Sequence, residues 1–165
     1  MRSIKSCPVL RRHLGCVALA LMTAVPAAWA AEVSYDFVAC TSGRSNLLFG
    51  SAEFVATGDE SFGVVASSTT KEWAGATTHC VGSMRLIAGN PAGSGFCKWV
   101  QMTGDTAVGQ YWFGDGKQTW TWLHGTGKLA GISGGGTFKY LFRGKPVEAG
   151  TSQSCRQDWG KYTLP

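Results

Sequence analysis

Charged side chains are scarce in this sequence, and outside its first thirty residues no basic run occurs. Lysine, arginine, aspartate and glutamate make up 15% of the chain, whose formal charge is +5. Four of the 15 basic residues and none of the 10 acidic ones lie in residues 1–30, so the remainder has a formal charge of +1. Its densest basic cluster is Lys139, Arg143 and Lys145. A nucleic-acid partner requires a basic stripe or patch, and we therefore exclude one.

The sequence also lacks the residue spacings that are typical of metal sites and of catalytic constellations. It has no Cys-x-x-Cys pair, and His79 and His124 lie far apart. No Ser–His–Asp, Cys–His or paired-carboxylate arrangement can be argued from spacing. The stretch Gly125–Lys128 is not a phosphate-binding loop, because Leu129 stands where serine or threonine is required. We therefore expect no metal and no cofactor, and we assign no catalytic residue.

Residues 1–30 have the pattern of a secretory signal peptide. Basic residues at positions 2, 5, 11 and 12 precede an apolar run over 14–26, and Ala28-Trp29-Ala30 places small residues at −3 and −1 of a cleavage site. A resident membrane helix needs about 20 apolar residues, more than this run supplies. The alternative, an uncleaved anchor, is therefore weaker. We expect a mature protein that begins at Ala31, has no membrane anchor and is secreted or periplasmic.

The remaining residues, 31–165, are rich in glycine and tryptophan and have almost no helical periodicity. Short runs of β-branched and aromatic residues recur between Gly, Asn, Asp and Pro. Turns are expected at Gly58–Glu60, Gly89–Gly93 and Gly114–Lys117. We predict a single all-β domain, an antiparallel barrel of about eight strands, with a β-sandwich as the alternative. The expected strands are 33–40, 47–57, 61–70, 79–88, 95–103, 107–113, 118–124, 137–143 and 158–164.

Four cysteines remain outside the signal peptide, and in an exported chain they predict two disulfides. Cys40 ends the first expected strand and Cys155 precedes the last, and these strands become neighbours when an even-stranded antiparallel barrel closes. That favours Cys40–Cys155 together with Cys80–Cys97. The second pair fits less well, since a loop at 89–93 would leave Cys97 about 16 Å from Cys80 along the strand, whereas bridged Cα atoms lie within about 7 Å. A bulge or another connectivity would resolve this conflict.

The densest glycine motif runs from Gly125-Thr126-Gly127 through Gly131 to Gly134-Gly135-Gly136. Glycine at this density in a strand region predicts bulges, corners or close approach of another backbone. The element resembles the one shared by dirigent proteins and the allene oxide cyclase barrel, and by secreted bacterial relatives of unassigned function. The resemblance covers 112–142 and implies a calycin-like barrel of eight antiparallel strands. The catalytic residues of those enzymes have no matching positions here, so the resemblance transfers no activity.

Aromatic side chains supply the candidate ligand-binding residues. Trp120, Trp122 and His124 alternate on one face of an expected strand, and Trp112 lies one strand earlier. These four residues could line a lumen suited to a planar, lipidic or sugar ligand. The interpretation we favour is that the rings fill a small barrel, whose interior is just wide enough for side chains.

Two functions follow from these observations. The first is an exported, non-catalytic module that binds a small apolar or aromatic ligand or a protein partner. The second is an isomerase- or cyclase-like enzyme acting on an apolar small molecule inside the barrel. The enzyme requires a carboxyl, tyrosine or histidine that is buried in the lumen and has a displaced pKa.

Overall fold

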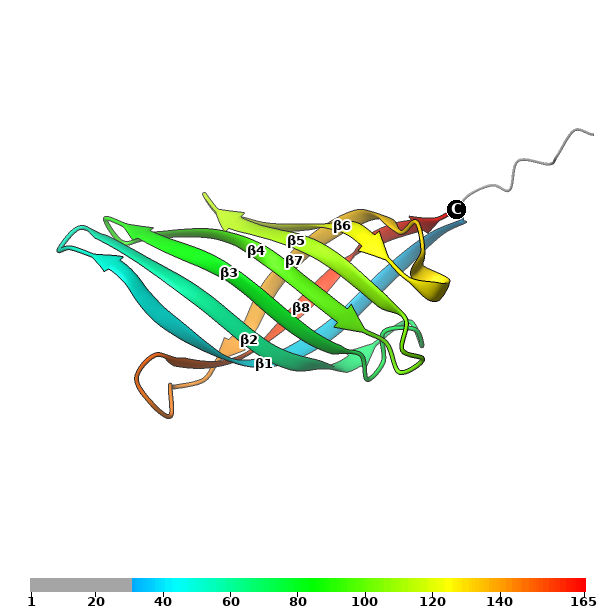
Figure 1. Cartoon of the computed structure of the whole chain (residues 1–165), viewed down its shortest axis with the longest axis horizontal. Coiled ribbons are helices and arrows are strands. Elements are labelled where there is room, and N and C mark those ends of the chain that lie inside the picture. Colours follow the sequence, from blue (N-terminus) through cyan, green and yellow to red (C-terminus); the bar gives the residue numbers. More distant parts are fainter. Residues whose placement is uncertain (1–30) are drawn as a thin grey trace, which may run out of the picture.

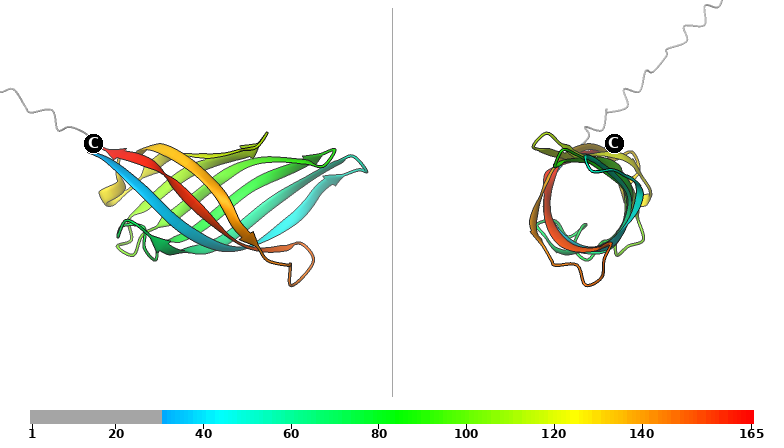
Figure 2. Two further views of the ribbon diagram at one scale, coloured as in Figure 1. Left: turned by 180° about the vertical axis from the view of Figure 1, so that it is seen from behind. Right: turned by 90° about the vertical axis from the view of Figure 1, so that its left-hand side faces the viewer.

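The computed structural model describes residues 31–165, and the expected signal peptide with its Ala28-Trp29-Ala30 site lies outside the described residues. Eight antiparallel strands, each hydrogen-bonded to the next, close into one barrel (Figures 1 and 2), which confirms the predicted fold class. No helix in the described part of the chain is long and apolar enough to cross a membrane. The elements are β1 (Ala31–Gly50), β2 (Phe54–Ser68), β3 (Thr77–Ile87), β4 (Asn90–Val100), β5 (Thr106–Gly114), β6 (Lys117–Gly125), the 3₁₀ turn η1 (Gly127–Leu129), β7 (Ser133–Arg143) and β8 (Thr151–Leu164).

Several of the expected strand boundaries are wrong, beginning with those of the first hairpin. The chain turns at 51–53, inside the expected strand 47–57, so that Phe49 and Val55 lie on paired strands. The expected turn at Gly58–Glu60 lies inside β2, where Gly58 pairs with Asn46. Asp59 faces the lumen of the barrel, where polar side chains line a cavity. Its polarity therefore marks a polar part of the interior and not a turn. The nine expected segments therefore become eight longer strands.

The register places both cysteine pairs directly opposite each other. Cys40 pairs with Cys155 across β1 and β8, and Cys80 pairs with Cys97 across β3 and β4; each pair is disulfide-bonded, with Cα atoms 4.0 Å apart. The expected loop at 89–93 was wrong. A two-residue turn at Ala88–Gly89, both with positive φ, starts β4 at Asn90 and removes the conflict. Two disulfides indicate an oxidising compartment outside the cytoplasm.

An aromatic plug fills the half of the lumen that lies toward the ends of the described chain. Trp73 reaches it from the loop between β2 and β3 and stacks on Trp122, with ring centroids 4.8 Å apart. The indole Nε1 of Trp120 donates a hydrogen bond of 2.7 Å to the Tyr35 hydroxyl. All members of the plug are at most 3% exposed; they are Tyr35, Phe37, Trp73, Trp99, Trp120, Trp122 and Tyr162.

Glycines facing the lumen make room for these rings in a narrow barrel. A Cβ on Gly109 would lie 2.5 Å from the Trp120 ring, and one on Gly136 would lie 2.6 Å from the Tyr35 hydroxyl. A Cβ on Gly160, the cross-strand partner of Gly136, would lie 2.8 Å from the same hydroxyl. At Gly134, Gly135 and Gly136 a Cβ would first meet backbone carbonyl oxygens of the neighbouring strands, at 2.5 Å or less, which is the close approach of another backbone that the sequence predicted.

Candidate functional site

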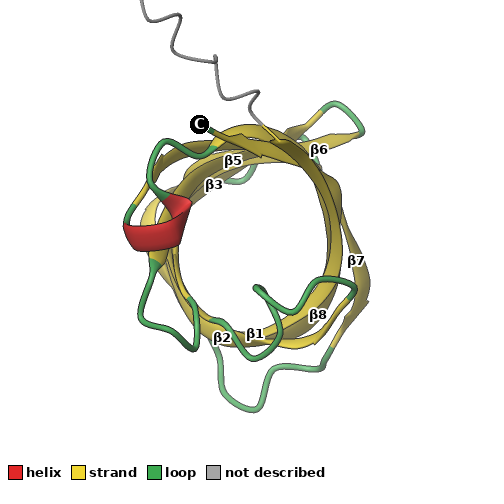
Figure 3. Cartoon of the chain, turned by 90° about the vertical axis from the view of Figure 1, so that its right-hand side faces the viewer, coloured by secondary structure: helices red, strands yellow, loops and turns green. Residues whose placement is uncertain are grey.

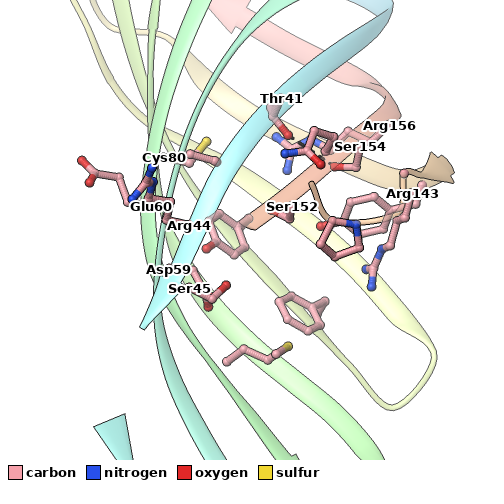
Figure 4. A pocket seen from close by; sticks show the side chains of 18 of the residues that line it. Thr41, Arg44, Ser45, Asp59, Glu60, Cys80, Arg143, Ser152, Ser154 and Arg156 are labelled. Carbon is pink, nitrogen blue, oxygen red and sulfur yellow. Dashed lines mark hydrogen bonds between the residues drawn. The ribbon is translucent and has the colours of Figure 1, made fainter. Parts of the chain in front are cut away.

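The other half of the lumen is hollow and forms the candidate site. Its cavity measures about 320 Å³ and lies against β1, β2, β3, β5, β7 and β8 and the start of the β7–β8 loop (Figure 4). We call it the lumen pocket. Viewed along the axis from the end where the described chain begins and ends, the strands form a closed ring, with η1 on the near rim, at the end opposite the lumen pocket (Figure 3). The barrel is thus solid at one end and hollow at the other.

Strand alternation decides which side chains reach the lumen pocket. On β8, Ser152, Ser154 and Arg156 face inward at every second position, while Cys155 between them faces outward. On β1, Thr41 faces inward, and its hydroxyl lies 3.3 Å from that of Ser154. One side of the pocket is therefore lined by hydroxyl groups that can donate or accept hydrogen bonds.

Four aromatic rings form the apolar wall of the lumen pocket. Tyr111 and Phe113 on β5 lie nearly parallel, with centroids 6.5 Å apart, and Phe138 and Tyr140 on β7 meet edge to face at 6.1 Å. A Cβ on Gly95 would lie 2.5 Å from the Tyr111 hydroxyl, so glycine gives this ring its space as well. A flat apolar molecule could pack on these rings.

The ladder between β6 and β7 is short, and it ends beside the lumen pocket. Residue pairs join these strands from Thr119–Thr137 to Thr121–Gly135, whereas β7 continues alone beside β8 as far as Arg143. The rings of Phe138 and Tyr140 stand on this unpaired half of β7. On the side of the pocket that faces β6, the second half of β7 therefore makes no cross-strand pairs with that strand.

A buried ion pair forms the deep end of the lumen pocket. Arg156 Nε donates a hydrogen bond of 3.1 Å to Asp158 Oδ2, and these side chains are 11% and 0% exposed. The guanidinium carbon lies 4.9 Å from the Phe138 ring centroid and 6.0 Å from that of Trp99. Arg156 lines the cavity, while Asp158 lies behind it. Of the two charged side chains, Arg156 is therefore the one that faces the cavity.

Burial displaces the pKa of the acidic groups around this ion pair. Loss of hydration raises the pKa of Asp158 to about 6, against the opposing attraction of Arg156. Burial also raises the pKa of Tyr111, and the charge of Asp59 raises it further. The pKa of Tyr35 is raised mainly by burial, so both phenols stay neutral at physiological pH. Near neutral pH, Asp158 is therefore the group of this region that is closest to gaining a proton.

The four binding candidates from the sequence lie in two different places. Trp120 and Trp122 face inward but belong to the aromatic plug, whereas Trp112 is on the outer surface and 37% exposed. The expectation that His124 shares their face is wrong. A β-bulge at Leu123 shifts the register, so that Val108 pairs with His124 and Gly109 with Trp122, and His124 is exposed.

Sequence reasoning missed the residues that line the lumen pocket. Ser152, Ser154, Arg156 and Asp158 alternate with a period of two, which is the signal of a strand with one polar, inward face. The expected last strand began at Asp158 and left this stretch out. Within residues 31–165, no three His, Cys, Asp or Glu side chains gather to hold a metal ion.

Comparison with known proteins shows a similarity in structure and none in sequence to a family model or a curated protein. No family model matches the sequence, and no curated protein matches it. A crystal structure of a DUF3224 family protein of unknown function from Shewanella oneidensis MR-1 is similar, with a TM-score of 0.52 and 12% sequence identity. The alignment covers 82% of this chain and 98% of that chain. At this identity the likeness supports the barrel fold and says nothing of activity.

Proposed function

We propose that the protein is an exported module that binds a small apolar or aromatic molecule in the lumen pocket without changing it chemically. The observation that carries this proposal is the division of the lumen into a solid plug and a cavity of about 320 Å³ walled by four aromatic rings. Small-molecule sites are typically concave, largely apolar and furnished with a few polar groups, with volumes of roughly 300–1,000 Å³. The lumen pocket is concave and has this volume, and its four aromatic rings supply an apolar wall, although polar side chains outnumber apolar ones in its lining.

A second candidate, an isomerase- or cyclase-like activity, is favoured by the resemblance to the allene oxide cyclase barrel and by Asp158. Asp158 is a buried carboxyl with a raised pKa, as such an enzyme requires. However, Arg156 lies between Asp158 and the cavity, so the carboxyl does not reach a molecule held there. A general acid or base must come within hydrogen-bonding distance of the reacting atom. Tyr111 does line the cavity, and because burial raises its pKa the phenol stays protonated and is not a base near neutral pH. With no base reaching the cavity from Asp158 or Tyr111, we place binding ahead of catalysis.

Export is the part of this proposal that the signal-peptide pattern supports, together with the two disulfides. Expression in a bacterium with its native leader is expected to release a protein that begins at Ala31, because Ala28-Trp29-Ala30 fits the cleavage rule. Intact-mass spectrometry of the periplasmic and medium fractions measures this directly. A mass that retains residues 1–30 would contradict cleavage at this site.

Binding can be tested by filling the lumen pocket. The neutral fluorescent probe N-phenyl-1-naphthylamine is expected to bind the wild-type protein. Ser154→Phe places a ring in the cavity and should weaken probe binding at least about tenfold, or about 1.4 kcal/mol. Titration of probe fluorescence gives both dissociation constants.

The matched control is the same substitution on the outer surface. Ser83 on β3 is exposed and faces away from the lumen, so Ser83→Phe should leave the affinity unchanged. Melting curves and near-UV circular dichroism establish that both variants fold. A folded Ser154→Phe protein with wild-type affinity, or a wild-type protein that does not bind the probe, would refute the proposal.

A further inference from the structure

Arg156 presents unused hydrogen-bond donors to the lumen pocket. Its guanidinium group has five N–H donors, and Nε donates to Asp158. Arg156 lines the cavity, and within the described chain no residue accepts a hydrogen bond from its two Nη groups. The Nη atoms are not among the buried unpartnered atoms of the described residues, so they are accessible from the cavity that Arg156 lines. Asp158 Oδ1, by contrast, is buried without a partner behind the guanidinium. The deep end of the cavity therefore offers guanidinium donors to a molecule bound there.

The surroundings of Arg156 fix the plane of its guanidinium and favour a negative partner. The Phe138 and Trp99 rings flank the group at 4.9 and 6.0 Å, and the Thr41 and Ser154 hydroxyls line the same region (Figure 4). Arg143, which also lines the pocket, lies 3.9 Å above the Tyr140 ring. A planar guanidinium held in this way matches the two oxygens of a carboxylate or sulfonate.

The acidic groups near the cavity do not occupy these Nη donors. Asp59 accepts the Thr57 hydroxyl at 3.2 Å, and Glu60 bonds His79 at 2.8 Å on the outer face. Asp158 takes Nε from behind. The charges that line the cavity nearly balance, those of Arg44, Arg143 and Arg156 against those of Asp59 and Glu60. An anion is therefore favoured by the accessible donors of Arg156 at the deep end and not by the net charge of the lining.

We propose that the ligand of the lumen pocket is an aromatic or apolar monoanion whose carboxylate or sulfonate binds the Nη groups of Arg156, with its rings packed on Tyr111, Phe113, Phe138 and Tyr140. This proposal rests on the proposed function and adds the chemical class of the ligand and its orientation. The anionic end lies deepest and the apolar body lies toward the opening.

Asp158 makes the binding of such an anion depend on pH. While it is ionised, it neutralises Arg156 and repels a second anion; once protonated, it leaves the guanidinium charge to the ligand. Burial raises the pKa of Asp158 to about 6, and a bound anion would raise it further. Binding therefore takes up a proton, and affinity rises as pH falls from 8 toward 5. Asp36 on β1 raises the pKa of Asp158 further, and Tyr35 and Tyr111 interact with the charge of Arg156. The other ionisable groups that line the cavity are Arg44, Asp59, Glu60, Tyr140 and Arg143.

Two probes that differ by one sulfonate test the inference. We compare 1-anilinonaphthalene-8-sulfonate with N-phenyl-1-naphthylamine at pH 5.5 and pH 8. The sulfonate stays ionised at both, and we expect it to bind at least about tenfold more tightly than the neutral probe at pH 5.5. Its affinity should fall about tenfold or more by pH 8, whereas that of the neutral probe should not change.

Paired variants locate the anion and keep the fold intact. Arg156→Met alone would leave Asp158 buried without a partner, so we use Arg156→Met/Asp158→Asn, which removes both charges together. This variant should bind the neutral probe like wild type and lose the preference for the sulfonate. Asp158→Asn alone should keep the preference and lose its pH dependence. Arg143→Met should weaken the preference less than Arg156→Met/Asp158→Asn does, and Arg85→Met on the exposed outer face of β3 should keep both.

The outcomes separate this inference from the function on which it rests. If neither probe binds, the proposed function fails. If the neutral probe binds and the sulfonate gains nothing, the pocket binds apolar molecules and the inference about an anion is overturned. Loss of the preference in Arg143→Met but not in the Arg156→Met/Asp158→Asn variant would place the anion at the wall and overturn its assignment to Arg156.

Discussion

Trp122→Ala is expected to lower the free energy of unfolding by about 3–5 kcal/mol, the usual cost of truncating a large aromatic residue in a packed core. Trp122 is 3% exposed and lies against Trp73, Trp120 and Tyr35 in the aromatic plug. Its Nε1 has no hydrogen-bond partner in the described chain, so the change removes packing and creates a cavity without breaking a hydrogen bond. Since domains are stable by about 5–15 kcal/mol, the loss should be large in urea unfolding.

Trp112→Ala is the matched control for this experiment. The residue is of the same type and lies on the adjacent strand β5, but it faces outward and is 37% exposed. Its truncation should cost about 1 kcal/mol or less, because it leaves no cavity. Equal losses for Trp112→Ala and Trp122→Ala, or wild-type unfolding of Trp122→Ala, would show that the plug is not the core of the barrel.

The barrel could be predicted from the sequence because its signals are local and repeated. β-branched and aromatic residues alternate along short runs, and turn residues separate them, so the strand count follows almost directly. Closure followed from that count, since the first and last strands of an even antiparallel barrel must pair. The same reasoning placed Cys40 beside Cys155, which are opposite each other in the register.

The errors arose where local composition conflicts with the position in the barrel. Leu47, Leu48 and Phe49 begin the expected strand 47–57, yet they lie exposed at the end of β1, near the tip of the β1–β2 hairpin. The bulge at Leu123 has no residue signature in the sequence, but it places His124 outside the lumen. Propensity describes a residue's preference, whereas register is fixed by pairing with a distant strand.

The candidate site was missed because the interior of this barrel is polar at one end. A search for an apolar lining selected the indoles, and the structure packs them against glycines as a plug. The first half of β8 reads as polar and loop-like, although Ser154 and Arg156 repeat at the strand period of two. A polar, inward face inverts the usual pattern of a half-buried strand, and sequence alternation does not say which face is inside.

Removing the Cys40–Cys155 disulfide is the other change with a large expected effect on stability. The bridge spans 115 residues, and Cys40→Ser/Cys155→Ser should lower the free energy of unfolding by about 4–5 kcal/mol by releasing loop entropy in the unfolded chain. Cys80→Ser/Cys97→Ser opens a span of 17 residues and should cost about 3 kcal/mol. Urea unfolding of both double variants beside wild type measures the difference.

Thiol titration and probe binding complete this experiment. The denatured wild-type protein from an oxidising compartment should contain no free thiol, and each double variant should also contain none. Cys155 faces outward between Ser154 and Arg156, whereas Cys80 lines the lumen pocket. Cys40→Ser/Cys155→Ser should therefore retain N-phenyl-1-naphthylamine binding at temperatures where it is folded. Two free thiols in the wild-type protein would contradict the two-disulfide arrangement. A larger stability loss from Cys80→Ser/Cys97→Ser would contradict the loop-entropy explanation, which predicts the larger loss for the longer span.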